Sequence, residues 1–228
     1  MLQSASVNNG GLKKTTNRYT TLLKYALDEC GRNARLAGEW AVPLPQYVDP
    51  SAKINPRTAA ASEIRALGSG RFLVLSRDGG AGRGQDLTRS LYRQVDVFSL
   101  RDATDIVGRY DDFGAAFAPG GVLRAGIVAA QYCPFLDINN DRELAKFGLL
   151  NGGADNDAPG LLNEKWEGLD LVPVHGEKDM FFLLASSDND FITQNGFFNF
   201  GRDTYRDAGG FGLLSQTLVF KVSIGGEK

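Results

Sequence analysis

The feature that most constrains the fold is an internal repeat of a short apolar segment. The segment FLVLSRD at residues 72–78 recurs as FLLASSD at residues 182–188, an offset of 110 residues. Each copy follows a segment led by a glutamate, Glu63 or Glu167, and the two glutamates are 104 residues apart. These offsets correspond to two or more propeller blades of about 40 to 50 residues each. The repeat therefore predicts two non-adjacent blades of one β-propeller.

Short apolar runs separated by glycine and proline also indicate an all-β chain. The 228 residues include 28 Gly and 8 Pro, distributed along the whole length. This spacing predicts strands bounded by turns at residues 19–27, 39–44, 62–67, 71–76, 91–100, 123–130, 168–172, 180–186 and 218–224. Residues 19–27 are equally compatible with a helix that ends at Gly31. One helix is predicted, over residues 141–147, with Asn140 or Asp141 as its N-cap.

At about 45 residues per blade, the chain supplies about four to five blades. Residues 1–17 are polar and predict a flexible N-terminal tail, and residues 18–228 predict a propeller domain.

Composition excludes several classes of function. The chain has 25 Lys and Arg against 27 Asp and Glu, so no broad basic field is available to bind nucleic acid. Its longest apolar runs, such as residues 180–185, are far shorter than the roughly 20 residues that cross a bilayer. A single histidine, His175, and two cysteines exclude His-rich metal centres and most zinc sites. Cys30 and Cys133 either form one disulfide or remain thiols.

Acidic residues flank both copies of the repeat. If each copy is a hairpin, Glu63 lies near Asp78 at one hairpin end, and Glu167 lies near Asp188. Glu164 and Asp190 lie close to the second pair in the sequence. Carboxylates gathered at one propeller mouth repel each other unless a cation or an arginine such as Arg77 compensates, and oxygen ligands suit Ca²⁺ or Mg²⁺. The alternative is that these acids begin turns or form surface pairs.

Two weaker motifs remain open. The glycine-rich stretch at residues 79–84 is either a loop between blades or a phosphate cradle aided by Arg77 and Arg83. The segment from Asp137 to Glu143 places oxygen side chains at alternate positions, as a calcium loop does, but Arg142 and Gly148 stand where an EF-hand needs Gly and Glu. We interpret that segment as a turn followed by a helix cap.

Four motifs give the chain a recognisable resemblance. They are residues 62–78, YCPFLD at 132–137, NEKWEGL at 163–169 and SDNDF at 187–191. With these motifs the sequence resembles the "esterase-like activity of phytase" family, or phytase-like domain, and especially its secreted fungal members, from about residue 18 to the end. The resemblance implies a β-propeller, hydrolysis of phosphoesters or esters by recurring Glu and Asp, and an extracellular location.

Two hypotheses follow for function. In the first, Glu63, Asp78, Glu167 and Asp188 hold a Ca²⁺ ion, Glu164 or Asp190 is the general base, and Arg77 and Arg83 bind a small phosphoester or ester substrate. In the second, the propeller is non-catalytic and its acidic mouth binds a metal or a partner.

Two features depart from the family pattern. Family members carry a signal peptide and further blades before the matched region, whereas the first ten residues here contain no apolar segment of a secretion signal. The resemblance therefore implies that the chain matches the C-terminal part of such a propeller, and that the roughly four to five blades of residues 18–228 form an incomplete, partial propeller. An incomplete array leaves strand edges and part of its core uncovered, which favours aggregation or pairing with another chain. Residues 212–217 also lack the acidic stretch expected before the last strand.

Overall fold

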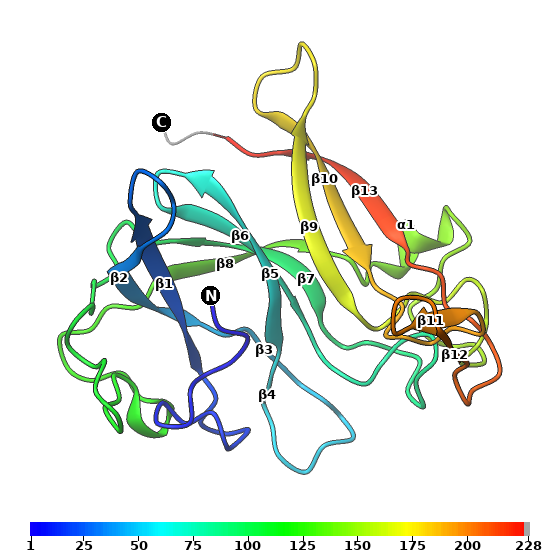
Figure 1. Cartoon of the computed structure of the whole chain (residues 1–228), viewed down its shortest axis with the longest axis horizontal. Coiled ribbons are helices and arrows are strands. Elements are labelled where there is room, and N and C mark those ends of the chain that lie inside the picture. The colour runs from blue at the N-terminus through cyan, green and yellow to red at the C-terminus, as the bar shows by residue number, and fades with distance from the viewer. Residues whose placement is uncertain (226–228) are drawn as a thin grey trace. The chain divides into compact units, whose positions relative to one another are not determined.

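The computed structural model describes residues 1–225 and consists mainly of antiparallel β-strands (Figure 1). The first eight strands are β1 Tyr19–Leu27, β2 Ala34–Pro43, β3 Gln46–Tyr47, β4 Arg57–Thr58, β5 Ala60–Gly68, β6 Arg71–Arg77, β7 Arg93–Ser99 and β8 Gln131–Asp137. The remaining strands are β9 Trp166–Pro173, β10 Met180–Ser187, β11 Gly196–Phe198, β12 Asp203–Tyr205 and β13 Thr217–Ser223. The helical segments in this part of the chain are a 3-10 turn at Pro119–Gly121 and helix α1 at Asp141–Ala145. The prediction of an all-β fold is confirmed.

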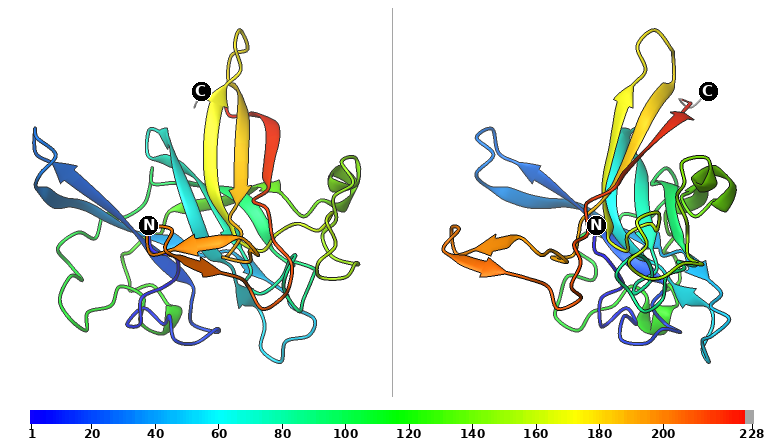
Figure 2. Two further views of the ribbon diagram at one scale, coloured as in Figure 1. Left: turned by 45° about the vertical axis from the view of Figure 1, so that its right-hand side comes forward. Right: turned by 90° about the vertical axis from the view of Figure 1, so that its right-hand side faces the viewer.

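The strands form five sheets, and no sheet closes on itself within residues 1–225. The largest has the order β5-β6-β7-β8, and a three-stranded sheet has the order β13-β10-β9. Three two-stranded sheets pair β1 with β2, β3 with β4, and β11 with β12. Figure 2 shows the β11–β12 hairpin as a narrow two-stranded ribbon. Within the described residues, one sheet has four strands, as a propeller blade does.

The chain forms two compact units. Unit 1 comprises Met1–Asp78 and Leu91–Ile138, and unit 2 comprises Gly79–Ser90 and Asn139–Lys228. Unit 1 thus contains β1 to β8, and unit 2 contains α1 and β9 to β13. Residues 18–228, the segment expected to be one propeller domain, are divided between these two units.

The core of unit 1 forms where the four-stranded sheet packs on the β1–β2 sheet. Val74 of β6 and Phe98 of β7 are fully buried and pack with Leu22 and Val42. Phe72 stacks on Phe98 with 4.9 Å between ring centroids. Because side chains alternate along a strand, Ala41, which precedes Val42 in β2, points to the opposite face of the β1–β2 sheet. There it packs against Ile106, Phe117, Ala118 and Ile127 from the long loop before β8. The β1–β2 sheet is therefore covered on both faces.

Most predicted strands match observed ones, and one does not. Residues 19–27 are a strand rather than a helix, and the predicted helix appears as α1, with the Asn140 side chain accepting the N–H of Glu143. The strand predicted at 123–130 is wrong, because that segment is a loop and strand β8 follows it. Pro134 lies within β8, which is an edge strand of its sheet. An edge strand tolerates a residue that lacks an N–H donor.

The first seventeen residues contain no helix or strand, but they are hydrogen-bonded to the rest of unit 1. The N–H of Leu2 donates to the carbonyl of Thr21, and the N–H of Ala61 donates to the carbonyl of Gln3. The side chain of Asn9 is buried and accepts the N–H of Ala118 at 2.9 Å. The segment predicted to be a loose tail is thus hydrogen-bonded to strands and loops of unit 1.

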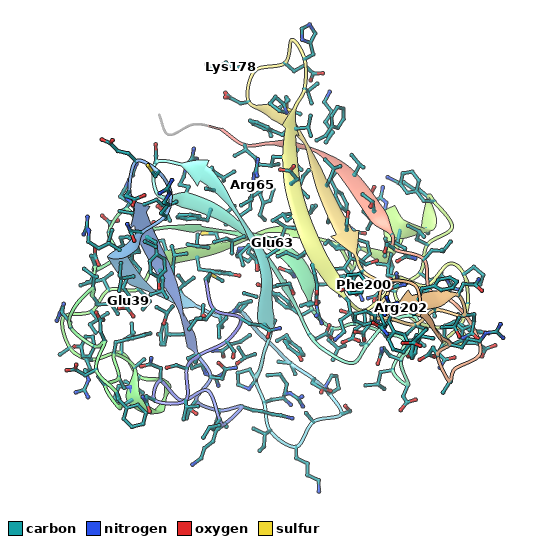
Figure 3. All side chains as sticks on the ribbon, in the orientation of Figure 1. Glu39, Glu63, Arg65, Lys178, Phe200 and Arg202 are labelled. Carbon is teal, nitrogen blue, oxygen red and sulfur yellow. The ribbon has the colours of Figure 1, made fainter. Side chains whose placement is uncertain are left out.

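A buried carboxyl group anchors the long loop to β2. Glu39 of β2, labelled in Figure 3, is 8% exposed, and its backbone carbonyl accepts the N–H of Ile106 at 2.8 Å. Asp105 accepts the backbone N–H of both Glu39 and Val107 at 3.0 Å. Burial, followed by the carboxyl group of Asp111, raises the pKa of Glu39 to about 7.

We expect this pair to make the protein more stable in acid than at neutral pH. Because the folded-state pKa of Glu39 is raised from 4.5 to about 7, its contribution is complete below pH 4.5 and is lost as the pH rises through 7. The loss is at most about 3 kcal/mol. Urea unfolding at pH 4.5 and 8 should show this difference in the wild type and not in Glu39→Gln. Glu29→Gln, in the exposed β1–β2 turn, is the matched control and should behave like the wild type. Equal pH dependence in Glu39→Gln and the wild type would contradict the assignment.

Candidate functional site

In unit 1 the structure does not bring Glu63 and Asp78 to the same hairpin end. Glu63 of β5 is exposed and lies opposite Leu75 of β6, three residues before Asp78. At about 3.3 Å per residue this separates the two positions by about 10 Å along the strand. The carboxylate of Glu63, labelled in Figure 3, accepts the N–H of Ile64 at 2.7 Å. Asp78 is buried, and its carboxylate accepts the N–H of Leu91 at 2.6 Å.

A β-bulge and a tight turn explain this register. Ser69 and Gly70, both with positive φ, form a two-residue turn between β5 and β6. Register shifts then occur between Ala66 and Gly68 and between Ala61 and Glu63. Each shift moves the pairing by one residue, so the distance in sequence from the turn does not give the partner of Glu63.

The two arginines predicted to bind substrate are engaged within the protein. Arg77 is 6% exposed, and its guanidinium lies 3.5 Å from the carbonyl of Asp78. Arg83, in unit 2, donates twice to the carbonyl of Asp157, at 3.1 and 2.9 Å. Arg83 thus holds the loop that contains Asp157. Its position in the glycine-rich stretch did not predict this structural role.

The glycine-rich loop at residues 79–84 is tied to unit 2 through its own N–H groups. Gly82, Arg83 and Gly84 donate to the carbonyls of Leu87, Leu162 and Asn156 at 2.7 to 2.8 Å. Gly80 donates to a carboxylate oxygen of Glu164 at 2.7 Å. Since these donors already have protein acceptors, they do not form a cradle for phosphate. The loop is instead hydrogen-bonded to neighbouring segments of unit 2.

The second hairpin gathers charged residues at one end of β9 and β10. Glu167 lies in a bulge opposite Ser186 and Ser187. Asp188 follows β10, and its N–H donates to the carbonyl of Lys165 at 2.9 Å. Glu167 and Asp188 therefore lie at the same hairpin end, as the sequence predicts for this copy. The carboxylate of Asp188 accepts the N–H of Asp190 at 2.9 Å, which holds the turn after β10.

Lys165 lies between the two carboxylates predicted to be catalytic. Its ammonium nitrogen is 3.7 Å from Glu164 Oε1 and 3.8 Å from Asp190 Oδ2. The Glu164 side chain is 7% exposed, whereas that of Asp190 is 44% exposed. Glu164 is held by the N–H of Gly80, and Asp190 is open to solvent. Lys165 stands between the two acids of the Asn-Glu-Lys-Trp-Glu motif, but the sequence alone predicted no role for it.

Asn163 holds this hairpin end to the last segment before β13. Its side-chain amide, fully buried, donates to Ser187 Oγ at 2.9 Å and to the carbonyl of Leu214 at 2.8 Å. Its backbone N–H donates to the side chain of Gln216 at 2.8 Å, and its carbonyl accepts the indole N–H of buried Trp166 at 2.8 Å. The conspicuous Asn and Trp of the motif therefore position the charged residues beside them.

The proposed calcium ion requires several acidic side chains close to one point. Among residues 1–225 no three His, Cys, Asp or Glu side chains are grouped so that they could hold a metal ion. Ca²⁺ takes six to eight oxygen ligands. At the β9–β10 hairpin the cation between Glu164 and Asp190 is the ammonium of Lys165. Within each unit, the side-chain geometry does not fit a calcium centre.

Comparison with known proteins gives one similar sequence. The chain is 42% identical over 209 residues to an "Uncharacterized secreted protein" of Arthroderma benhamiae. The aligned region covers 86% of this chain and 40% of that relative, so the chain spans less than half of the relative's length. No protein-family model and no solved structure matches the chain. No helix within residues 1–225 is long and apolar enough to cross a membrane.

We expect Asn163 to be essential for the stability of unit 2. Replacing it with Ala removes the side-chain donors to buried Ser187 and to the carbonyl of Leu214, and the loss of these two hydrogen bonds should lower the free energy of unfolding by about 1 to 3 kcal/mol. Asn195→Ala, at an exposed position, is the matched control and should change it by less than about 0.5 kcal/mol. Urea denaturation followed by tryptophan fluorescence measures both. Similar midpoints for the two variants would show that the Asn163 contacts contribute little.

Proposed function

We propose that the chain is part of an extracellular phytase-like β-propeller hydrolase. The family motifs at residues 163–169 and 187–191 support this proposal, because they form the charged end of one hairpin. The name of the Arthroderma benhamiae relative supports the extracellular location. The propeller architecture is supported by the antiparallel sheets and by the repeat that relates β6 to β10.

The observation that carries the catalytic proposal is the position of Lys165 between Glu164 and Asp190. In this mechanism, exposed Asp190 takes a proton from water, and the resulting hydroxide adds to the carbonyl carbon of an ester. The Lys165 ammonium stabilises the oxyanion that forms. When the alcohol leaves, it recovers the proton from Asp190. Buried Glu164 holds Lys165 in place and is a positioning residue.

Charge favours a neutral carboxylic ester over a phosphate ester as the substrate. The hairpin end carries four carboxylates, Glu164, Glu167, Asp188 and Asp190, against the single ammonium of Lys165. A phosphate monoester is a dianion near neutral pH and would be repelled by this excess of negative charge. Arg77 and Arg83, the arginines expected to bind phosphate, already contact backbone carbonyls. The proposed reaction is therefore hydrolysis of an uncharged ester.

The same excess of negative charge favours a second candidate function. Glu167 and Asp188 are exposed, and both lie at this hairpin end. A non-catalytic module would use them to bind a cationic partner, with Lys165 limiting repulsion between the acids. Turnover of an ester substrate distinguishes the hydrolase from the non-catalytic binding module.

We expect slow hydrolysis of p-nitrophenyl acetate and none of p-nitrophenyl phosphate. Asp190→Asn should reduce kcat by about 100-fold or more, because general-base catalysis typically contributes at least that factor. Lys165→Met should reduce kcat as well. Matched controls are Glu177→Gln and Lys178→Met, in the turn between β9 and β10, which should retain wild-type kcat. Equal activity in Asp190→Asn and Glu177→Gln would refute the catalytic role and favour the binding module.

Calcium provides a separate test. Because no group of three His, Cys, Asp or Glu side chains that could hold a metal ion is present in the described part of the chain, Ca²⁺ at about 5 mM should leave the melting temperature unchanged. A calcium site would instead add about 2.7 kcal/mol of stability at 100 times its dissociation constant. A rise in melting temperature that disappears in Asp188→Ala, but persists in Asp203→Ala, would restore the calcium hypothesis.

A further inference from the structure

The tip of the β11–β12 hairpin in unit 2 is made of exposed phenylalanines. Phe197 and Phe198 of β11 are 69% and 56% exposed, and Phe200, in the turn between the strands, is fully exposed. Because neighbouring side chains alternate along a strand, Phe197 and Phe198 point to opposite faces of the ribbon. We call these three phenylalanines the aromatic tip. The hairpin is therefore apolar on both faces and at its end.

The backbone at the end of the aromatic tip is unfavourable for the residue that occupies it. Asn199 and Phe200 have φ angles of 50° and 57°, in the left-handed region. The N–H of Gly201 donates to the carbonyl of Phe198 at 3.1 Å, which closes a turn around these two residues. The second central position of such a turn favours glycine, because a residue with a Cβ is strained there. Strain of this kind is typical of positions where the side chain has a function.

The base of the hairpin, in contrast, is held by hydrogen bonds. The N–H of Asp207 donates to the carbonyl of Thr193 at 2.8 Å, and its carboxylate accepts the N–H of Gly209 at 2.8 Å. The side-chain amide of Gln194 donates to the carbonyls of Asp207 and Phe211 at 2.9 and 3.2 Å. Unit 2 therefore presents the aromatic tip on a fixed base.

Two arginines beside the aromatic tip carry charge that the protein does not neutralise. Arg202, labelled with Phe200 in Figure 3, lies in the turn, and Arg206 directly follows β12. Both arginines are exposed, and within residues 1–225 neither guanidinium forms an ion pair with a carboxylate. Residues 196–206 contain these two arginines and one acid, Asp203, and so carry a net charge of +1. The tip thus combines exposed aromatic rings with available positive charge.

We propose that the aromatic tip binds the surface of a phospholipid bilayer. In this arrangement its three phenylalanines lie among the acyl chains just below the headgroups, and Arg202 binds a lipid phosphate. A rigid partner would cover one face of the ribbon, whereas a fluid bilayer surrounds the tip and covers both faces and the end. Phenylalanine, unlike tyrosine and tryptophan, has no polar group to hydrogen-bond a sugar or a peptide. The guanidinium supplies the polar recognition, because it binds phosphate through paired hydrogen bonds.

The dimensions of the hairpin fit this depth of binding. Each strand has three residues, so the ribbon is about 10 Å long, and interfacial elements enter the headgroup boundary by about 5 to 10 Å. The outer edges of a two-stranded ribbon carry outward-facing N–H and C=O groups, which need water or headgroups as partners. The hairpin therefore rests at the interface without crossing the membrane. This binding is independent of the proposed hydrolase activity, because it uses no residue of the β9–β10 hairpin end.

The test is co-sedimentation of the intact protein with phosphatidylcholine vesicles that contain about 30% phosphatidylserine. We expect the wild type to sediment with the vesicles. Phe200→Gly should lower the partition coefficient by about 10-fold, because it removes a large apolar side chain. It should not lower the melting temperature, because glycine suits the left-handed turn. Arg202→Gln should lower the partition coefficient by about 5-fold, which is the contribution of one arginine near an anionic membrane surface.

The matched controls are Phe113→Gly, at a fully exposed phenylalanine in a loop of unit 1, and Arg142→Gln, at an exposed arginine of α1. Both should bind vesicles as the wild type does. Phe200→Trp reports insertion directly, because its fluorescence emission should shift to shorter wavelength when vesicles are added, whereas that of Phe113→Trp should not.

Three results would overturn the proposal. The first is a wild-type protein that does not sediment with vesicles. The second is an equal partition coefficient in Phe200→Gly and Phe113→Gly. The third is retention of the wild type on insoluble cellulose, lost in Phe200→Gly, without any binding to vesicles, since that result would assign the aromatic tip to a polysaccharide.

Discussion

The structure depends on a strand that is apolar on both faces. Strand β6 points Phe72 and Val74 to one side and Leu73 and Leu75 to the other, and Leu73, Val74 and Leu75 are fully buried. A strand of this composition is stable only when both faces of its sheet are covered, because each exposed apolar side chain forfeits about 1.5 to 3 kcal/mol of burial. In unit 1 the β1–β2 sheet covers one face, and that sheet is covered in turn by the loop before β8. The layered packing of unit 1 therefore follows from a strand that is apolar on both faces.

The second copy of this strand, β10, carries the same requirement but meets it on one face only. The contrast between Val74, fully buried, and Leu184, its partly buried counterpart in the repeat, is the most direct physical difference between the two strands. It concerns packing rather than backbone geometry, since both hairpins are antiparallel and both strands keep the repeat.

The repeat made the strands predictable, but not the positions of the acids. Strands 71–76 and 180–186 are visible as apolar runs bounded by turns, because burial and turn chemistry are local properties of the sequence. Glu63 could not be placed, because bulges in β5 shift its pairing to Leu75. Strand β8 was missed because Pro134 argues against a strand unless the edge position is known. Glu167 and Asp188 were placed correctly, since their bulge lies at the hairpin end itself.

Lys165 could not be recognised from the sequence for a further reason. A lysine in a charged motif is ordinarily solvated, and only the fold shows that Glu164 is 7% exposed and hydrogen-bonded to Gly80. Another buried carboxyl group, that of Asp96, is held by neutral partners, the hydroxyls of Tyr92 and Tyr132 at 2.7 and 2.8 Å. Burial raises the pKa of Asp96, which favours its neutral form in the core.

Glu164 differs from Asp96 because its partners are a cation and a backbone N–H. The buried Glu164 side chain holds the ammonium of Lys165 on one side. On the other side Asp190 is more exposed and is held by a short turn through Asp188. The two ion pairs are therefore unequal: one is rigid, and the other opens to water at little cost because exposed ion pairs are worth at most about 1 kcal/mol. In the proposed mechanism, that inequality would allow Asp190 to exchange its contact with Lys165 for a water molecule, while Lys165 stays in position to stabilise an oxyanion.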